Sequence, residues 1–223
     1  MKEKEIEDEL VSIRSMMERS SKFISLSGLS GILAGVYALV GAGFIYYFIY
    51  VSVPDYYQIT ENTTPIKGLF YGSNGEIFYA GFDYNLQKIL LTAFLVLFAS
   101  VGTGVFLSAR KAKRKEQPIW SSTSRALLFH MATPLLTGGI LILILIAHRN
   151  YEIAAPAMLI FYGLALISAS SYTFSMVKYL GLCEIILGLI AACLPGYGLL
   201  FWAIGFGVLH IIYGSMMYFK YDR

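Results

Sequence analysis

The sequence predicts an all-α fold, a polytopic transmembrane bundle of six helices that we expect to form three helical hairpins. Of its 223 residues, 57% are apolar and only 14% are charged, whereas a soluble domain carries about 25% charge. The charges are also bunched, so that long apolar stretches separate them. A stretch of about 20 residues, rising 1.5 Å per residue, crosses a hydrocarbon core of about 30 Å. This pattern excludes a soluble globular protein and an intrinsically disordered one.

An amphipathic helix is expected at 1–22, before the first apolar stretch. Ile6, Leu10, Ile13 and Met17 recur at four-three-four spacing, which places them on one face of a helix. The other faces are charged, with an acidic excess, and an acidic helix gains little from an anionic membrane surface. We therefore expect these four residues to be an interaction seam. The helix either caps its own bundle or contacts a second copy or a cytoplasmic protein partner.

The transmembrane domain is expected at 23–219, followed by a short cytoplasmic tail at 220–223. Its spans are predicted at about 23–53, 89–109, 126–148, 154–174, 177–194 and 199–219. The last two are divided at 195–198, Pro-Gly-Tyr-Gly, because proline and paired glycines favour a tight turn over a continuing helix.

The long connection at 54–88 is expected to lie outside the cytoplasm and to contain a small β-hairpin. Asn74 and Gly75 form a pair that readily takes the positive dihedrals of a tight hairpin turn. Aromatic residues flank the pair, and aromatic side chains near a membrane boundary are usually interfacial anchors. A small extracytoplasmic β-hairpin at the membrane surface follows from this pattern.

The distribution of lysine and arginine predicts the orientation. With a cytoplasmic N-terminus, all of these residues except Lys67, Lys88 and Arg149 fall on the cytoplasmic side. Cytoplasmic loops of membrane proteins carry an excess of positive charge, so both termini are expected to be cytoplasmic. The basic run at 110–115 is interpreted as part of this topology signal, and no nucleic-acid binding is expected.

An internal echo links the first and fifth spans. Five identities align without a gap: Gly28, Leu29, Ile32, Gly35 and Ala38 match Gly181, Leu182, Ile185, Gly188 and Ala191. Both spans are expected to run in the same direction, so the match predicts repeated helical hairpins related by an axis along the membrane normal. The alternative is that small and aliphatic residues align by chance, since they are common in all membrane helices.

These residues give the chain a resemblance to HdeD-like membrane proteins, carried by Gly181 to Gly214, with the turn at Pro195, and by 28–38. The resemblance implies three two-helix repeats, each with a glycine-rich first helix and a proline-containing outer turn. The long outer loop and the acidic N-terminal helix depart from it. Separately, 17–31 resembles the start of a group of uncharacterised bacterial six-helix membrane proteins. Together the two resemblances imply a bacterial inner (plasma) membrane and a link to acid stress, but no reaction.

Three ionisable residues within the spans are candidates for a functional pocket: Glu184, His130 and His210. Such groups are costly in lipid unless they are paired or hydrated. Each shares a helical face with small or hydroxyl residues, which indicates that all three point into the bundle, in the inner half of the membrane. They could bond to one another, bind a proton or ligand, or hold a metal. The spacing matches no metal-binding motif, so neither a metal nor a cofactor is expected.

Two functions are favoured over a third alternative, an intramembrane metallohydrolase. The leading expectation is a non-enzymatic structural, stress-related or regulatory protein, whose partners are membrane lipids, a second copy or a cytoplasmic protein. The alternative is a small transporter or a ligand- or proton-binding membrane protein that uses the inner-half pocket. The sequence contains no Walker loop, dinucleotide fingerprint or nucleophile elbow, so an enzyme is not expected.

Overall fold

The structure is a computed structural model that describes residues 27–52, 70–71, 77–78, 80–114 and 120–222. The predicted N-terminal helix at 1–22 and its seam of Ile6, Leu10, Ile13 and Met17 lie outside the described residues, as does most of the loop at 54–88. Those expectations stay predictions.

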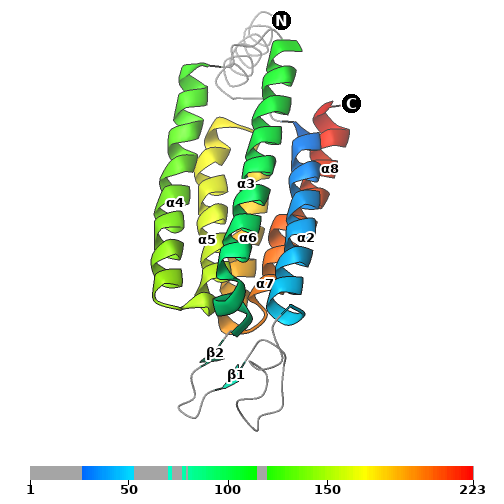
Figure 1. Ribbon diagram of the computed structural model, residues 1–223. Helices are drawn as coiled ribbons and strands as arrows, with labels where there is room; N and C mark the ends of the chain where they lie inside the picture. Colours follow the sequence, from blue (N-terminus) through cyan, green and yellow to red (C-terminus); the bar gives the residue numbers. More distant parts are fainter. Residues whose placement is uncertain (1–26, 53–69, 72–76, 79, 115–119, 223) are drawn as a thin grey trace, which may run out of the picture.

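In the described part of the chain, six helical segments are long and apolar enough to cross a membrane, which confirms a multi-pass helical membrane protein (Figure 1). The first five are α2 (Gly28–Tyr50), α3 (Ala80–Arg114), α4 (Ser122–Ala147), α5 (Tyr151–Ala169) and α6 (Met176–Cys193). The 3-10 turn η2 (Ser170–Tyr172) extends α5. The sixth segment is composite: α7 (Gly198–Trp202), η3 (Ala203–Leu209), α8 (His210–Met217) and η4 (Tyr218–Asp222).

The second span differs from its prediction at its start. Helix α3 begins at Ala80 rather than at 89, and it contains a kink at Asn85, whose backbone is not helical. The buried side chain of Asn85 donates hydrogen bonds to the carbonyl of Phe48 (2.8 Å) and to the hydroxyl of Ser52 (3.1 Å). The side chain thus binds a carbonyl at the end of α2, which intrahelical bonds leave without a partner. A contact between distant residues therefore extends the helix beyond the apolar stretch.

The sixth segment is not a regular α-helix. Its central part, η3, is π-helical, a form that is rare and frequently found at functional sites. Gly205 and Gly207 lie within η3 and are buried. The sequence pattern predicted only one continuous helix here, because the π-helical turn has no periodicity of its own in so short a segment.

Two short strands lie in the connection between α2 and α3. Strands β1 (Phe70–Tyr71) and β2 (Ile77–Phe78) pair antiparallel, with Phe70 opposite Phe78 and Tyr71 opposite Ile77. The turn expected at Asn74 and Gly75 lies outside the described residues, so the complete hairpin stays a prediction.

Glycines bring α5 and α6 into backbone contact. A methyl group added at Gly181 would lie 2.7 Å from the carbonyl oxygen of Gly163, and one at Gly163 would lie 2.5 Å from the carbonyl oxygen of Gly181. Helices α2 and α8 meet in the same way, since a methyl at Gly28 would lie 2.6 Å from the carbonyl oxygen of Gly214. Small residues allow such close approach, and in lipid this packing is a main source of helix association.

The two glycine contacts correspond residue by residue. Gly35 of α2 faces Ile211 of the last segment, and Gly188 of α6 faces Ile160 of α5; in each case an added methyl would lie 2.7 Å from the isoleucine Cγ1 atom. The glycines of the sequence echo therefore make matching contacts in the two helix pairs.

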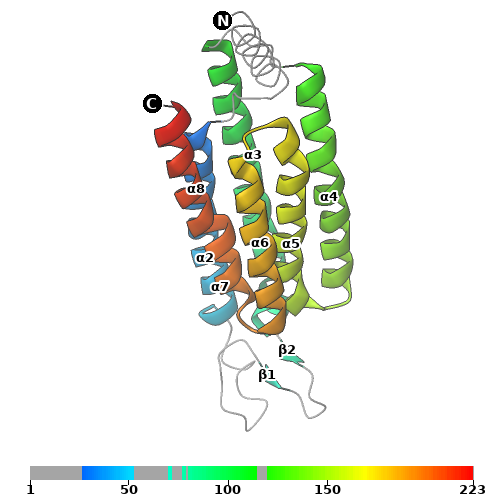
Figure 2. The same cartoon turned by 180° about the vertical axis from the view of Figure 1, so that it is seen from behind.

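The helices form one bundle in which α5, α6, α2 and the last segment are the most enclosed (Figures 1 and 2). Helix α3 packs against α2, and α4 packs against α5, but α3 and α4 have hardly any contact with each other. Helix α2 begins at the end of the bundle where α8 finishes, because Gly28 contacts the backbone of Tyr218.

Candidate functional site

Glu184 of α6 is fully buried, with 0% of its surface exposed. Neither of its carboxyl oxygens has a hydrogen-bond partner among the described residues. A methyl at Gly205 would lie 2.5 Å from both Glu184 Oε2 and Leu159 Cδ2. Gly205 and Leu159 therefore enclose the Oε2 side of the carboxyl group. A buried carboxylate without a partner is costly in an apolar interior. The carboxyl group therefore needs either a bound proton or a positive neighbour.

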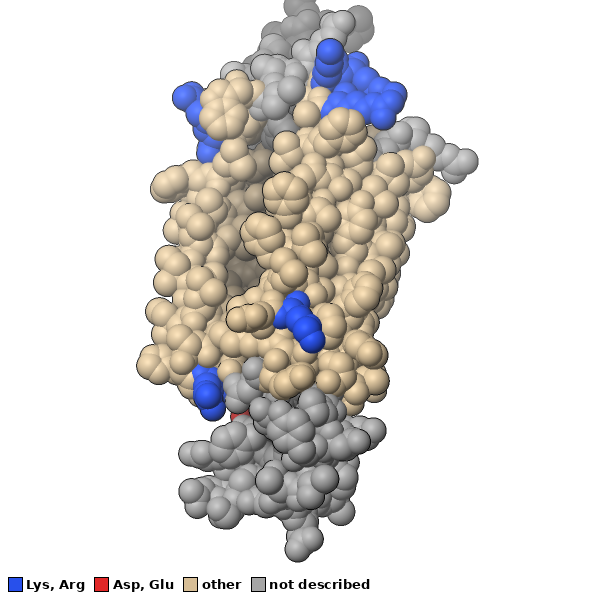
Figure 3. Space-filling model, viewed as in Figure 1, with Lys and Arg blue, Asp and Glu red and all other residues tan. Residues whose placement is uncertain are grey.

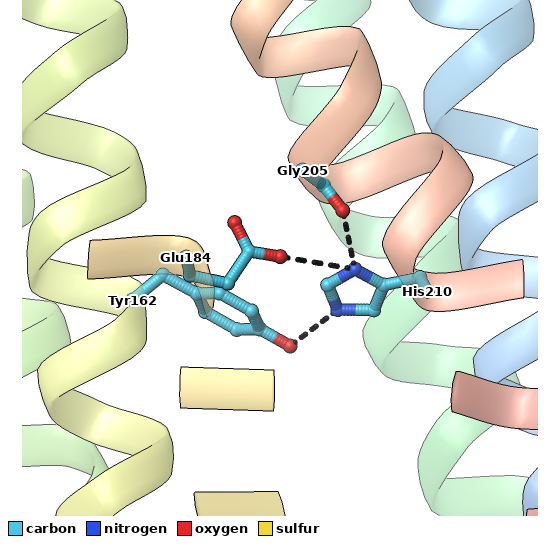
Figure 4. A network of polar contacts seen from close by, with 4 residues as sticks. All are labelled: Tyr162, Glu184, Gly205 and His210. Atoms are coloured by element: carbon cyan, nitrogen blue, oxygen red, sulfur yellow. Dashed lines mark hydrogen bonds and ion pairs between the residues drawn. The ribbon is translucent and has the colours of Figure 1, made fainter. Parts of the chain in front are cut away.

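His210, at the start of α8, is that neighbour. Its ring nitrogen Nδ1 lies 3.5 Å from Glu184 Oε1 and 3.0 Å from the carbonyl oxygen of Gly205 (Figure 4). Because a carbonyl oxygen only accepts hydrogen bonds, Nδ1 carries a hydrogen and donates it. The π-helical segment η3 thus holds the imidazole by its own backbone, with one edge of the ring directed at the carboxyl group.

Tyr162 of α5 completes the cluster. Its hydroxyl oxygen lies 2.7 Å from Nε2 of His210, the second ring nitrogen. A hydroxyl group both donates and accepts, so Tyr162 donates to a neutral imidazole and accepts from a charged imidazolium. The hydrogen bond consequently accommodates both charge states of His210. We call Glu184, His210 and Tyr162 the central cluster.

The central cluster lies at mid-length of the bundle. Its three members fall near the middle of their candidate spans, which are Tyr151–Tyr172, Met176–Cys193 and Gly198–Tyr221. Their depth in the membrane, expected in its inner half, stays a prediction.

His130 does not join the central cluster, so the predicted three-residue pocket is corrected at this position. It is exposed on α4, where its Nε2 lies 2.9 Å from the hydroxyl of Tyr172 and the two rings stack at 4.9 Å. Helix α4 packs its Gly138 against Phe161 of α5, and His130 lies about 80° around the helix from Gly138. That rotation turns the histidine away from the packed side.

The hydroxyl residues that suggested a buried face for His130 serve another purpose. Thr133 and Thr137 donate to backbone carbonyls four residues earlier, those of Phe129 and Thr133. Threonine commonly satisfies its hydroxyl in this way within a membrane helix. The pattern around His130 was therefore local to α4 and carried no information about a partner.

Sequence reasoning missed Tyr162, Gly205 and Tyr213. The Tyr213 hydroxyl is buried and has no hydrogen-bond partner among the described residues. Tyr162 and Tyr213 each come directly before a packing glycine, Gly163 or Gly214. That shared position is a signal that could have marked both tyrosines as buried; nothing in the sequence marked the contact of Gly205 with Glu184.

The chemistry available to the central cluster is proton binding. Glu184 and His210 can hold a shared proton as a neutral pair or as an ion pair, and removal of that proton leaves one net negative charge in an apolar interior. Among the residues that the structure describes, no three histidine, cysteine or acidic side chains come together as metal ligands.

No family model, no curated protein and no solved structure matches this chain. The resemblance to HdeD-like proteins therefore stays a prediction, and the functional argument depends on the residues themselves.

Proposed function

We propose that this chain is a non-enzymatic, regulatory or stress-related membrane protein whose central cluster binds a proton. One observation carries the proposal: the carboxyl group of Glu184 is fully buried, neither oxygen is hydrogen-bonded by a described residue, and an imidazole nitrogen lies 3.5 Å away. The proposal combines two expectations from the sequence. The non-enzymatic role was the leading one, and proton binding belonged to the alternative of a transporter or a ligand- or proton-binding protein.

Electrostatics supports a proton that is held and exchanged by the pair. Two unit charges about 4 Å apart attract by about 4 kcal/mol at an effective dielectric constant of about 20. A charge on either Glu184 or His210 therefore changes the affinity of the other for its proton. A rise in pH that removes the shared proton leaves the carboxylate uncompensated in apolar surroundings, which is a strained state.

The π-helical segment gives the bound proton a structural consequence. His210 Nδ1 lies within reach of both the Gly205 carbonyl (3.0 Å) and the Glu184 carboxyl (3.5 Å). A stronger attraction to a charged Glu184 draws the ring toward α6 and weakens its bond to η3. Protonation thus biases the conformation of the last span, the kind of local charge event that regulates a protein.

The proposal includes the membrane arrangement expected from the sequence. The chain lies in a bacterial inner (plasma) membrane with both termini cytoplasmic, since all but three of its lysines and arginines then lie inside. It folds as three helical hairpins, an arrangement that the matching glycine contacts support. The N-terminal seam contacts a second copy or a cytoplasmic protein, and through this contact the partner responds to the protonation-dependent conformation of the bundle.

A small transporter is the second candidate, and η3 favours it. Irregular helices at mid-membrane, next to an ionisable group, are typical of substrate and ion sites in transporters. A proton flux through liposomes carrying the purified protein, lost in Glu184→Gln, would favour transport; a pH response without flux would favour regulation.

Trp202 offers a direct test of proton binding. It is one of two tryptophans in the chain, and its ring lies 5.2 Å from that of Phe206 in η3. The other is Trp120, which is exposed, so Trp120→Phe leaves a single reporter beside the cluster. We expect the Trp202 emission to change with pH in this background and the change to disappear in Glu184→Gln.

The matched control is Glu152→Gln, because Glu152 is a carboxylate in the first turn of α5, away from the cluster. It should leave the pH response of Trp202 unchanged. The same transition in Glu184→Gln as in the parent, with both proteins folded, would disprove the proposed proton site.

A further inference from the structure

The hydroxyl group of Tyr213 is buried, and no described residue forms a hydrogen bond with it. A buried polar group of this kind is usually bonded by a water molecule, since an unmade hydrogen bond is costly. A hydroxyl group can accept a proton and release its own, so it can pass a proton on without a change of charge. The following inference asks how a proton reaches the central cluster, and it rests on the proton binding proposed above.

Tyr213 lies one turn beyond His210 on the same helix. The two residues are three positions apart in α8, a spacing that makes them neighbours on one side of a helix. Tyr162 and Tyr213 pack against the same cluster of buried apolar side chains from α5 and α6, and the two tyrosines are within electrostatic range of each other. Tyr213 therefore continues the line of polar groups that begins with Glu184, His210 and Tyr162.

This line leads to the end of the bundle where α8 finishes. Tyr221 of η4 is within electrostatic range of Tyr213, and its ring lies 4.4 Å from that of Phe174. Lys111 Nζ, at the end of α3, lies 5.8 Å from the same Phe174 ring. Figure 3 shows basic side chains at this end of α3, and such residues mark the part of a membrane protein that faces water. Tyr213 thus lies between the central cluster and a hydrated surface.

The opposite side of the central cluster is apolar on all three of its segments. Residues 153–161 of α5, 185–192 of α6 and 199–209 of the last segment contain no charged, hydroxyl or amide side chain. These stretches run toward the Pro195 turn, where a methyl at Gly198 would meet Ala155 of α5 at 3.2 Å. The shortest of them covers about 12 Å of helix. Trp202 has the one polar atom in these stretches, an indole nitrogen that only donates and so cannot relay a proton.

Close packing closes this side at the cluster itself. A methyl at Gly205 would meet Leu159 Cδ2 at 2.5 Å and Leu187 Cδ2 at 3.2 Å. The ring of Phe206 lies 5.0 Å from that of Tyr162 and 5.2 Å from that of Trp202. Apolar surroundings of this kind stay dry, so they offer a proton no carrier between the cluster and the Pro195 turn.

Few titratable or charged groups surround the path. Those that the structure places beside it come from five segments: Lys111 of α3, Tyr162 of α5, Glu184 of α6, His210 of α8 and Tyr221 of η4. Lys178 of α6 is exposed. Helix α2 packs on α8 but contains no acidic, basic or histidine residue. The response to pH therefore belongs to Glu184 and His210, and Tyr213 serves as an uncharged relay.

We infer that the central cluster exchanges its proton only with the compartment at the end of the bundle where α8 finishes, and that Tyr213 relays this proton. With the expected cytoplasmic C-terminus, the protein responds to the pH of the cytoplasm. A site that is open to one side and closed to the other suits regulation rather than transport.

The proton moves by successive exchanges. The Tyr213 hydroxyl accepts a proton from water and releases its own toward Tyr162, whose hydroxyl in turn gives a proton to Nε2 of His210. The ring then releases its Nδ1 proton to Glu184, because Nε2 faces Tyr162 and Nδ1 faces the carboxyl group (Figure 4). Each relay group ends with as many protons as it had at the start, and one proton has passed from water to the carboxylate.

The first test is the side from which pH acts. The full chain with Trp120→Phe and an affinity tag after its C-terminus is reconstituted at low density, so that most vesicles hold one molecule. Vesicles with an external C-terminus are captured by the tag. A step in external pH should change the Trp202 emission of the captured vesicles immediately. In the remaining vesicles the same step should have no effect until a protonophore equalises the pH across the membrane.

The second test is Tyr213→Phe, which removes the hydroxyl and keeps the ring. We expect the Trp202 response to keep its midpoint and to slow about tenfold or more after a stopped-flow pH step, because a positioned proton donor typically speeds a transfer by about 10²–10⁴. A purely structural role would shift the midpoint instead of the rate. The matched control is Tyr179→Phe, since Tyr179 is exposed on the first turn of α6 at the same end of the bundle. Circular dichroism checks that both variants are folded.

Three results would overturn the inference and leave proton binding in place. The first is an immediate response to pH on the opposite side, and the second is a response to pH on either side. The third is an unchanged rate or a shifted midpoint in Tyr213→Phe. A Trp202 response that is absent in the parent protein, or equal in Glu184→Gln, would instead remove the proton site on which the inference depends.

Discussion

Gly205→Ala is the most informative single substitution for the central cluster. The added methyl would lie 2.5 Å from Glu184 Oε2 and equally close to Leu159 Cδ2, about 1 Å inside ordinary van der Waals contact. Both groups must move, and overpacking of this kind costs about 1–3 kcal/mol. Alanine has a better helix propensity than glycine, which offsets up to about 1 kcal/mol of this cost. We expect a net loss of about 1–2 kcal/mol.

Thermal unfolding in detergent, followed by circular dichroism, measures this cost. For a chain of this length about 1–2 kcal/mol lowers the melting temperature by roughly 2–8 °C. Gly43→Ala is the control, because a methyl there meets no atom of the described residues within 4 Å, and it should be neutral or slightly stabilising. The pH response of Trp202 should also shift in Gly205→Ala, since the carboxyl group is displaced from His210.

A double-mutant cycle separates the carboxyl group from the leucine. In a Glu184→Ala background the methyl at position 205 keeps its contacts with Leu159 and, at 3.2 Å, with Leu187 Cδ2 but loses the one with the carboxyl group, so the cost of Gly205→Ala should fall by about half. Coupling of contacting residues is typically about 0.5–3 kcal/mol. An unchanged cost in that background, or a cost no greater than that of Gly43→Ala, would refute the close contact between η3 and Glu184.

Two further predictions concern the histidines. Tyr162→Phe removes the hydroxyl that meets His210 Nε2 at 2.7 Å and leaves a buried ring nitrogen without a partner, so we expect a loss of about 1–3 kcal/mol in the same thermal assay; unaltered stability would argue against this bond. His130→Ala should leave the pH response of Trp202 intact, because His130 is exposed and paired with Tyr172; loss of that response would mean that His130 acts with the central cluster after all.

The spans were predictable because hydropathy is a local property. Each apolar stretch needs only the bilayer as its partner, and the turn at Pro195 and Gly196 is also specified locally. The start of α3 was not predictable in this way. Asn85 interrupts the helical backbone and hydrogen-bonds to the end of α2, a contact between residues far apart in the sequence.

The candidate site was predictable only in part. Glu184 was identified because a lone carboxyl group in an apolar span requires compensation, and His210 was a plausible source of it. His130 had similar local surroundings, but α4 turns it outward. Nothing in a single helix specifies which residue of another helix lies opposite, so the three candidates could not be sorted before the helices were packed.

By itself the sequence determined that the chain is a membrane protein of six spans with one costly carboxyl group in the fifth, since burial in lipid penalises charge wherever the chain folds. Only the tertiary structure decided that Glu184 meets His210 and Tyr162, that Gly205 makes room for it in a π-helical turn, and that α3 and α4 stand apart. Hydropathy sets which segments enter the membrane, whereas close packing between particular side chains and glycines sets which of their faces meet.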